Sequence, residues 1–328
     1  MSSDVLLKVK NLNTYFKTEN GLLQAVDQVT FQVRKGELLG IVGESGCGKS
    51  ITSLSIMGLT AKNCVVEADS IAFENKELTT LSDKERRNLR GGDMAMIFQE
   101  PLTSLNPLFT IGYQLEEAIR CHNKISRSQA SELAVAILEK VGIARAHEIL
   151  HEYPNSLSGG MRQRIMIAMA LVNDPSLLIA DEPTTALDVT IQAQILQLIR
   201  NLMREFGTAV MFITHDLGVV AEIADRVMVM YAGQIVEEAD VYDLFAHPYH
   251  PYTSGLMGST IQVQQEKQVL QTIPGTVPSL AKMPKGCRFA PRCPYATEAC
   301  RVTMPELEEL PDGRRIRCLR WKEKTHNG

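Results

Sequence analysis

Two stretches near the start of the chain alternate apolar and polar residues, the pattern of strands with one buried face. They are "LLKVKNLNTYF" (6–16) and "AVDQVTFQV" (25–33), which we expect to form antiparallel strands. A short continuous apolar run, "LLGIV" (38–42), instead predicts a strand that is buried on both faces. Comparable runs at 177–180 and 209–214 predict two further buried strands.

Apolar residues at helical spacing lie between these strands. Strands that alternate with helices predict an α/β fold with a mainly parallel sheet. We expect the helical stretch at about 103–165 to form an inserted lobe, and a hairpin over 226–239 to turn at Gly233. The expected helices cover 51–59, 113–142 (between Pro107 and Gly142), a segment opened by Ser158, and 191–206.

The composition changes after about residue 240. Nine of the 14 prolines lie between Pro248 and Pro311, and four of the seven cysteines lie in the last 42 residues. We therefore expect two parts: an α/β domain over 1–240 and an irregular Cys- and Pro-rich C-terminal extension over 241–328.

Charge and hydropathy narrow the class of protein. The net charge is −4, so the chain lacks the basic footprint of a nucleic-acid-binding protein. The sequence has no run of about 18 apolar residues, so no membrane span is predicted. The N-terminus also lacks the basic and apolar regions of a secretory signal. We expect the chain to stay in the cytosol, where seven cysteines do not indicate a disulfide framework.

Residues 43–50, "GESGCGKS", fit the pattern G-x-x-x-x-G-K-[ST] of a phosphate-binding loop and lie between an expected strand and an expected helix. In such a loop backbone N–H groups converge on phosphates, a lysine adds positive charge, and a hydroxyl binds Mg²⁺. The motif predicts a P-loop nucleoside triphosphatase. The predicted nucleotide-binding residues here are Gly43, Glu44, Ser45, Gly46, Cys47, Gly48, Lys49, Ser50 and Ile51.

Two adjacent acids follow the strand expected at 177–180. Because ligands gather at the carboxyl ends of strands in such sheets, Asp181 and Glu182 should lie beside the phosphate loop. Consecutive strand residues point opposite ways, so we assign Asp181 to Mg²⁺ through a water and Glu182 to polarising the attacking water. Gln99 and His215, which also end apolar runs, join them as catalytic candidates.

The stretch "LSGGMRQR" (157–164) contains a second candidate anion site. Ser158, Gly159 and Gly160 open an expected helix, and a helix N-terminus with free N–H groups favours an anion. The phosphate loop lies elsewhere in the sequence, at 43–50, so this second candidate anion site must have a different function.

Five motifs together resemble the nucleotide-binding subunit of ABC transporters over about residues 5–240: "GESGCGKS", "FQEP", "LSGGMRQR", "LLIADEPTTALD" and "THD". The resemblance implies an ATPase in which two subunits close head to tail around ATP. Ser158, Gly159 and Gly160 of one subunit would then cap the γ-phosphate bound to the phosphate loop of the other.

The same resemblance implies roles for single residues. Gln99 would sense the γ-phosphate and contact the membrane subunit, His215 would steady the γ-phosphate and water, and Asp188 would lie in the loop that contacts the partner subunit. The family stacks adenine on an aromatic residue upstream of the phosphate loop, for which Phe16 is the candidate and Tyr15 the alternative. Glu182 would be the general base. The implied Mg²⁺ ligands are Ser50, Gln99 and Asp181.

Three segments of the extension resemble the dipeptide/oligopeptide branch of ABC importers: "HPYHPYTSGLMGS" (247–259), "IPGTVPSL" (273–280) and "GCRFAPRCPYATEAC" (286–300). This implies peptide import with a second, related ATPase subunit, two permease subunits and an extracytoplasmic binding protein, at the cytoplasmic face of a bacterial inner membrane. Import of another small solute such as nickel, a soluble non-transport ABC ATPase and a small-molecule kinase are the alternatives.

Four cysteines of the extension have the spacing C-x₅-C-x₆-C-x₁₇-C: Cys287, Cys293, Cys300 and Cys318. Paired C-x₂-C spacing would indicate zinc, and it is not present here. Four thiolates in a Pro-rich segment with little core of its own fit a [4Fe–4S] cluster, to which the importer resemblance also points. Zinc and unligated thiols are the alternatives.

Overall fold

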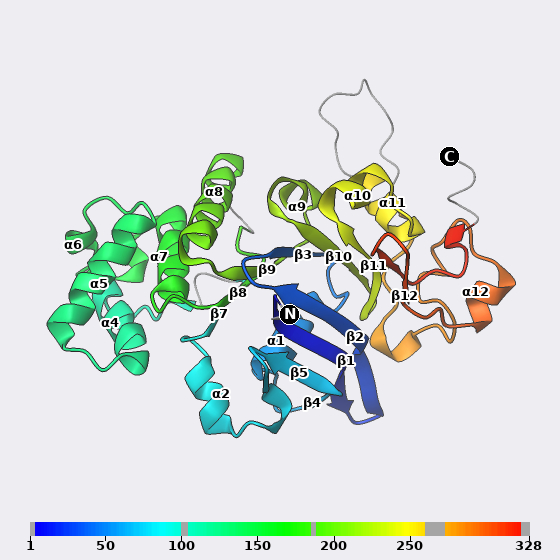
Figure 1. Ribbon diagram of the computed structural model, residues 1–328, viewed down its shortest axis with the longest axis horizontal. Coiled ribbons are helices and arrows are strands. Elements are labelled where there is room, and N and C mark those ends of the chain that lie inside the picture. Colours follow the sequence, from blue (N-terminus) through cyan, green and yellow to red (C-terminus); the bar gives the residue numbers. More distant parts are fainter. Residues whose placement is uncertain (1–3, 100–103, 185–187, 260–272, 323–328) are drawn as a thin grey trace. The chain divides into compact units, whose positions relative to one another are not determined.

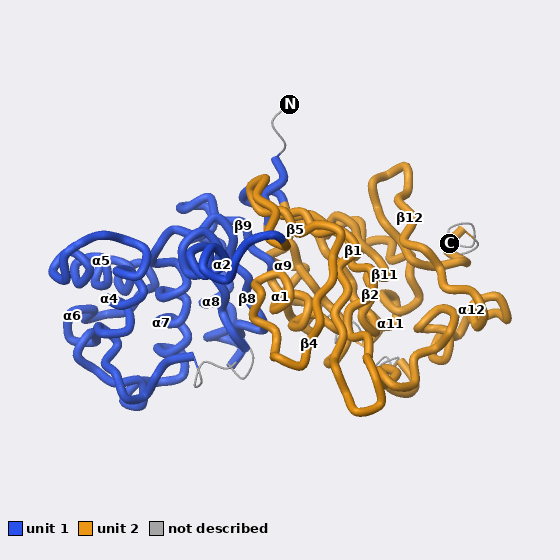
Figure 2. The backbone as a smooth tube through the Cα atoms, turned by 90° about the horizontal axis from the view of Figure 1, so that it is seen from below, with its two compact units in different colours: residues 1–6, 34–37, 80–211 blue, residues 7–33, 38–79, 212–328 orange. Residues whose placement is uncertain are grey.

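The computed structural model describes residues 4–99, 104–184, 188–259 and 273–322. Two compact units divide the chain, and each combines segments that are distant in sequence (Figure 2). The first unit, blue in Figure 2, comprises residues 1–6, 34–37 and 80–211. The second unit, orange in Figure 2, comprises residues 7–33, 38–79 and 212–328.

The first unit contains a parallel strand pair and most of the helices. Strands β7 (Met94–Ile97) and β8 (Leu177–Asp181) pair in parallel from Met94↔Leu177 to Ile97↔Ala180. Their apolar runs are buried, as predicted for 177–180. The α-helices of this unit are α2 (Asp83–Leu89), α4 (Ile111–His122), α5 (Arg127–Lys140), α6 (Ala146–Ile149), α7 (Gly159–Leu171) and α8 (Val189–Phe206).

Side-chain caps fix where these helices begin. The stretch 113–142 forms two helices because Ser126 starts α5 with a capping box, in which Gln129 reaches back to the Ser126 backbone. Thr110 caps α4 with its hydroxyl alone, which accepts from the Tyr113 N–H. Helices α4, α5 and α6 pack together as the predicted helical lobe, and they lie side by side in Figure 1.

The second unit contains an antiparallel sheet in the order β2-β1-β5-β6, with β4 also paired to β1. The two predicted N-terminal strands are present as its longest members, β1 and β2. Its strands are β1 (Val5–Thr18), β2 (Gly21–Arg34), β4 (Cys64–Glu67), β5 (Ser70–Phe73) and β6 (Lys76–Glu77).

A second sheet in this unit carries the phosphate loop. Strand β3 (Leu38–Val42) pairs in parallel with β10 (Arg226–Tyr231), and β10 turns at Gly233 into antiparallel β11 (Gln234–Asp240). Strand β9 (Ala209–Thr214) runs from the first unit into the second. Helices α1 (Lys49–Met57) and α9 (Leu217–Ile223) follow β3 and β9 along the chain.

The C-terminal extension is less irregular than its composition suggests. Strand β13 (Arg315–Ile316) pairs with β11 through Glu237↔Ile316 and with β12 (Glu308–Glu309). Strands of two residues have no periodicity, so the sequence gives no signal for them. Its helices are α10 (Val241–Ala246), α11 (Pro251–Gly258) and α12 (Glu298–Val302).

Within the described ranges, none of the helices combines the length and the apolar character needed to cross a lipid bilayer.

Candidate active site

The phosphate loop links the end of β3 to the start of α1, the position that the motif predicts. Gly43 has φ 153°, and a Cβ there would lie 2.2 Å from the Met230 carbonyl oxygen and 2.7 Å from Cys47 Sγ, so no larger residue fits. Gly46 has φ 77°, and no atom of the described residues lies within 4 Å of its Cβ position. The loop is thus packed on one side and accessible on the other.

Lys49 lies across this loop. Its side chain belongs to the first turn of α1, and its ammonium group donates hydrogen bonds to the carbonyls of Gly43 (2.7 Å) and Glu44 (3.1 Å). Cys47 packs beneath it, with only 1% of its surface exposed. Burial raises the pKa of the Cys47 thiol, and the nearby Lys49 charge offsets this only in part. Cys47 is therefore a neutral packing residue.

The two aromatic candidates for adenine stacking lie on opposite faces of β1. Phe16 is on the face of Thr14, whose hydroxyl is 2.8 Å from that of Ser55 on α1. Tyr15 is on the other face, and its pKa is raised by burial and by the charges of Glu67 and Asp27. Only Phe16 shares the face that contacts the helix behind the phosphate loop, and its role stays a prediction.

In the first unit, Asp181 is the last residue of β8 and is 4% exposed. Glu182 lies beyond the strand with φ 48°, a left-handed conformation that is rare for glutamate. Because the chain leaves β8 after Asp181, strand alternation does not decide the direction of the Glu182 side chain, and the separate roles of the two acids stay predictions. Such backbone strain is typical of functional sites.

Gln99 and Glu182 are brought together by the pairing of β7 with β8. Gln99 lies two residues beyond the end of β7, and its side-chain amide donates to the Glu182 carboxylate at 3.1 Å. Parallel neighbouring strands end at the same edge of a sheet, which explains this contact across 83 residues of sequence.

His215 directly follows β9 and is exposed. It belongs to the second unit, as the phosphate loop does, whereas the acids and Gln99 belong to the first. The next residue, Asp216, caps α9 by accepting a hydrogen bond from the Gly218 N–H at 2.8 Å.

Ser158, Gly159 and Gly160 start α7, as the sequence predicts. The Ser158 hydroxyl caps the helix by accepting from the Met161 N–H at 3.3 Å. A Cβ at Gly160 would lie 3.3 Å from Ile191 on α8, but the described residues place no atom within 4 Å of a Cβ at Gly159. Gly159 thus presents an open backbone surface.

Asp188 caps α8, with its carboxylate accepting from the Ile191 N–H at 3.0 Å. Sequence reasoning missed Gln163, which is 1% exposed and donates from its side-chain amide to the Pro183 carbonyl. This contact joins α7 to the backbone that follows Glu182. The only sequence signal was a polar residue on the buried face of a helix.

The four cysteines of the extension line one cavity of about 400 Å³, together with His250 and Phe289. The Cys287 N–H donates to the Cys300 carbonyl at 2.8 Å, which joins two of the segments. Burial raises the pKa of Cys287, and burial with the neighbouring cysteines raises that of Cys318 to about 11. Among the described residues, no three His, Cys, Asp or Glu side chains form a group that could hold a metal ion.

Comparison with known proteins agrees with this fold and these motifs. Residues 26–185 match the family described as "ABC transporter", and residues 236–300 match "Oligopeptide/dipeptide transporter, C-terminal region". The chain belongs to the ABC transporter family of ATP-binding proteins and is an ATPase of that family.

Two curated relatives resemble the chain over nearly its full length. The oligopeptide transport ATP-binding protein AppD of Bacillus subtilis (strain 168) is 52% identical over 97% of this chain and 98% of its own. The dipeptide transport ATP-binding protein DppD of Escherichia coli (strain K12) is 49% identical over 95% of this chain and 96% of its own.

A solved structure supports the same cassette fold. The dimeric ATP-binding cassette MJ0796, bound to ADP and Pi in a post-hydrolysis state, is 28% identical, with a TM-score of 0.65 over 72% of this chain and 99% of its own.

Proposed function

We propose that this chain hydrolyses ATP to drive the import of dipeptides or oligopeptides through a multi-subunit transporter. The observation that carries the proposal is the likeness to AppD and DppD, which extends through the C-terminal region as well as the cassette. The match of residues 236–300 to the C-terminal region of oligopeptide/dipeptide transporters favours a transporter over a soluble ABC ATPase or a small-molecule kinase. We place the boundary between cassette and extension near residue 240.

The geometry of each unit suits its part of this reaction. The loop N–H groups and Lys49 bind the phosphates of ATP, and Phe16 stacks on adenine. Glu182 takes the proton of the attacking water while Gln99 orients its carboxylate, and His215 steadies the γ-phosphate. Mg²⁺ would neutralise phosphate charge, bound by Ser50, Gln99 and, through water, Asp181.

The transporter requires two ATPase subunits, because the exposed backbone at Gly159 acts in the nucleotide site of a partner subunit. The start of α7 caps the γ-phosphate held by that partner, and Asp188 lies in the contacting loop. The partner is a second, related ATPase chain. Two permease subunits and an extracytoplasmic binding protein complete the transporter, with this chain peripheral at the cytoplasmic face of the inner membrane.

Reconstitution tests the substrate class. The complex that co-purifies with this chain from membranes, placed in lipid vesicles with its binding protein, is expected to hydrolyse ATP faster when di- or oligopeptides are added. Lys49→Ala should abolish the response, because the loop loses its phosphate-binding charge. Stimulation by nickel and not by peptides would overturn the substrate assignment.

We further propose that Cys287, Cys293, Cys300 and Cys318 hold a [4Fe–4S] cluster. All four thiols line one cavity, and the Cys300 Sγ lies 3.3 Å from the Thr297 hydroxyl oxygen. The donor set is all sulfur, as Cys₄ clusters need.

Cys287→Ser is expected to abolish the brown absorbance of anaerobically purified protein and to lower its iron from about four atoms per chain. The physical reason is that a serine oxygen is a poor ligand for the cluster. Cys121→Ser, on an exposed face of α4, should leave absorbance and iron unchanged. Colourless wild-type protein with stoichiometric zinc would contradict the cluster.

A further inference from the structure

The first variable residue of the phosphate loop, Glu44, is bound by the C-terminal extension. Both guanidinium Nη atoms of Arg292 donate to the Glu44 carboxylate, at 2.6 Å and 3.0 Å. The Arg292 side chain is 5% exposed, and that of Glu44 is 31% exposed. This two-point geometry fixes the carboxylate in orientation as well as in distance.

A second group of the extension binds the backbone of the same residue. The Glu44 N–H donates to the hydroxyl of Tyr252 at 2.9 Å. Tyr252 is fully buried, and burial raises its pKa, so the hydroxyl stays protonated and accepts the bond through a lone pair. Glu44 is thus held at both its side chain and its main chain.

Packing around Arg292 and Tyr252 keeps them in place. The Arg292 Nε donates to the Pro274 carbonyl at 2.8 Å, and its guanidinium lies 5.7 Å from the centre of the Tyr231 ring. Tyr231 and Tyr252 pack edge to face at 4.6 Å, and Phe289 packs against both. Phe289 also lines the four-cysteine cavity, so these rings lie between the cavity and the loop.

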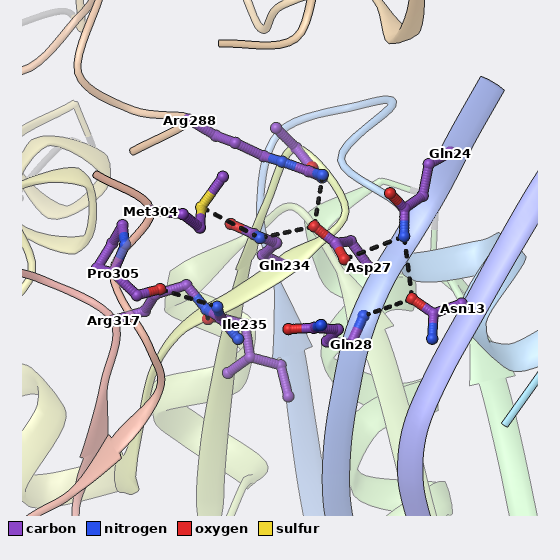
Figure 3. Close-up of polar contacts among 11 residues, drawn as sticks. Asn13, Gln24, Asp27, Gln28, Gln234, Ile235, Arg288, Met304, Pro305 and Arg317 are labelled. Carbon is purple, nitrogen blue, oxygen red and sulfur yellow. Dashed lines mark hydrogen bonds and ion pairs between the residues drawn. The ribbon is translucent and has the colours of Figure 1, made fainter. Parts of the chain in front are cut away.

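Arg288, four residues before Arg292, makes a similar connection to the cassette (Figure 3). Its guanidinium donates to Asp27 at 2.6 Å and to the Ala232 carbonyl. Asp27 also accepts from Gln234 at 2.8 Å. The residue after Ala232, Gly233, donates its N–H to the Cys47 carbonyl of the phosphate loop at 2.8 Å.

We propose that Arg292 and Tyr252 are positioning residues of the nucleotide site: they hold Glu44 so that the phosphate loop is ordered for ATP. A glycine-rich loop binds phosphate only when its N–H groups point to one place. Arg292 also neutralises a carboxylate that stands within an anion-binding loop. Without this cation, the Glu44 charge repels the triphosphate.

The charge argument predicts an asymmetry between single and double variants. Arg292→Gln should weaken ATP binding about tenfold, the effect of losing a charged hydrogen bond. Glu44→Gln should weaken it less, because the charge that it leaves unpaired, on Arg292, attracts the triphosphate and does not repel it. Adding Glu44→Gln to Arg292→Gln should restore part of the affinity, which a purely structural role of Arg292 would not produce.

The test uses the full chain, a fluorescent ATP analogue for affinity, and the assembled transporter for KM and kcat. The affinity change should appear in KM more than in kcat. Tyr252→Phe removes only the accepting oxygen, and Tyr252, unlike Arg292, is not adjacent in sequence to a cysteine. Arg301→Gln is the matched control, because Arg301 also adjoins a cysteine but its side chain is 61% exposed.

Unchanged affinity for the analogue in both Arg292→Gln and Tyr252→Phe would overturn the proposal. It would also be overturned if the double variant, Glu44→Gln with Arg292→Gln, bound the analogue more weakly than Arg292→Gln alone. Should Arg292→Gln not fold, normal affinity in Tyr252→Phe would overturn it. Binding of the analogue is measured on the isolated chain, so the result does not depend on which solute the transporter carries.

Discussion

Glu182→Gln is expected to lower ATP turnover of the assembled transporter about 10²–10⁴-fold while ATP stays bound. The amide keeps the shape of the carboxylate but cannot take a proton from water. Gln99, whose amide now donates to Glu182 at 3.1 Å, can still pair with the new side-chain oxygen. The backbone at φ 48° is left unchanged.

The measurement is phosphate release together with the mass of the complex in ATP. The variant should remain as an ATP-bound dimer of subunits, since ATP joins them and is no longer cleaved. Glu139→Gln, an exposed glutamate on α5, is the matched control and should hydrolyse ATP normally. Brisk hydrolysis by Glu182→Gln would show that another group is the base.

Gly159→Asp should lower turnover in the assembled complex at least tenfold without destabilising the chain. A carboxylate at the first position of α7 interacts favourably with the helix dipole, by about 0.3–1 kcal/mol. The described residues leave space for the new side chain. In the partner's site, however, the same charge would face the γ-phosphate.

Thermal unfolding of the isolated chain and ATP turnover of the complex separate these effects. Gly159→Asn has the same size without the charge, so it should lower turnover less than Gly159→Asp does. Normal turnover with Asp at position 159 would contradict the assignment of this helix start to a partner's ATP. A lower unfolding temperature of Gly159→Asp would contradict the conclusion that the surface at Gly159 has space for a side chain.

The strands at 6–16 and 38–42 could be predicted because burial imposes a pattern on every residue of a strand. The phosphate loop could be predicted because its backbone excludes side chains at Gly43 and requires φ values that favour glycine. In each case local sequence carries the constraint.

Other features depend on contacts that local sequence does not encode. The pairing of Arg292 with Glu44 spans 248 positions, and neither residue belongs to a repeating pattern. Gln163 looks like an ordinary polar helix residue until the Pro183 carbonyl is placed against it. The conformation of Glu182 was also missed, because a strand end carries no signal for a left-handed φ.

Three buried arginines of the extension, each next to a cysteine, reach the cassette: Arg288 at Asp27, Arg292 at Glu44, and Arg317 at the Ile235 carbonyl. Shortening the protein at the change in composition would remove an arginine donor from each of two carboxylates and from one carbonyl. The cassette therefore depends on contacts with its own extension and cannot simply be separated from it. Swapping extensions between related transporters should succeed only when their matching acids are exchanged with them.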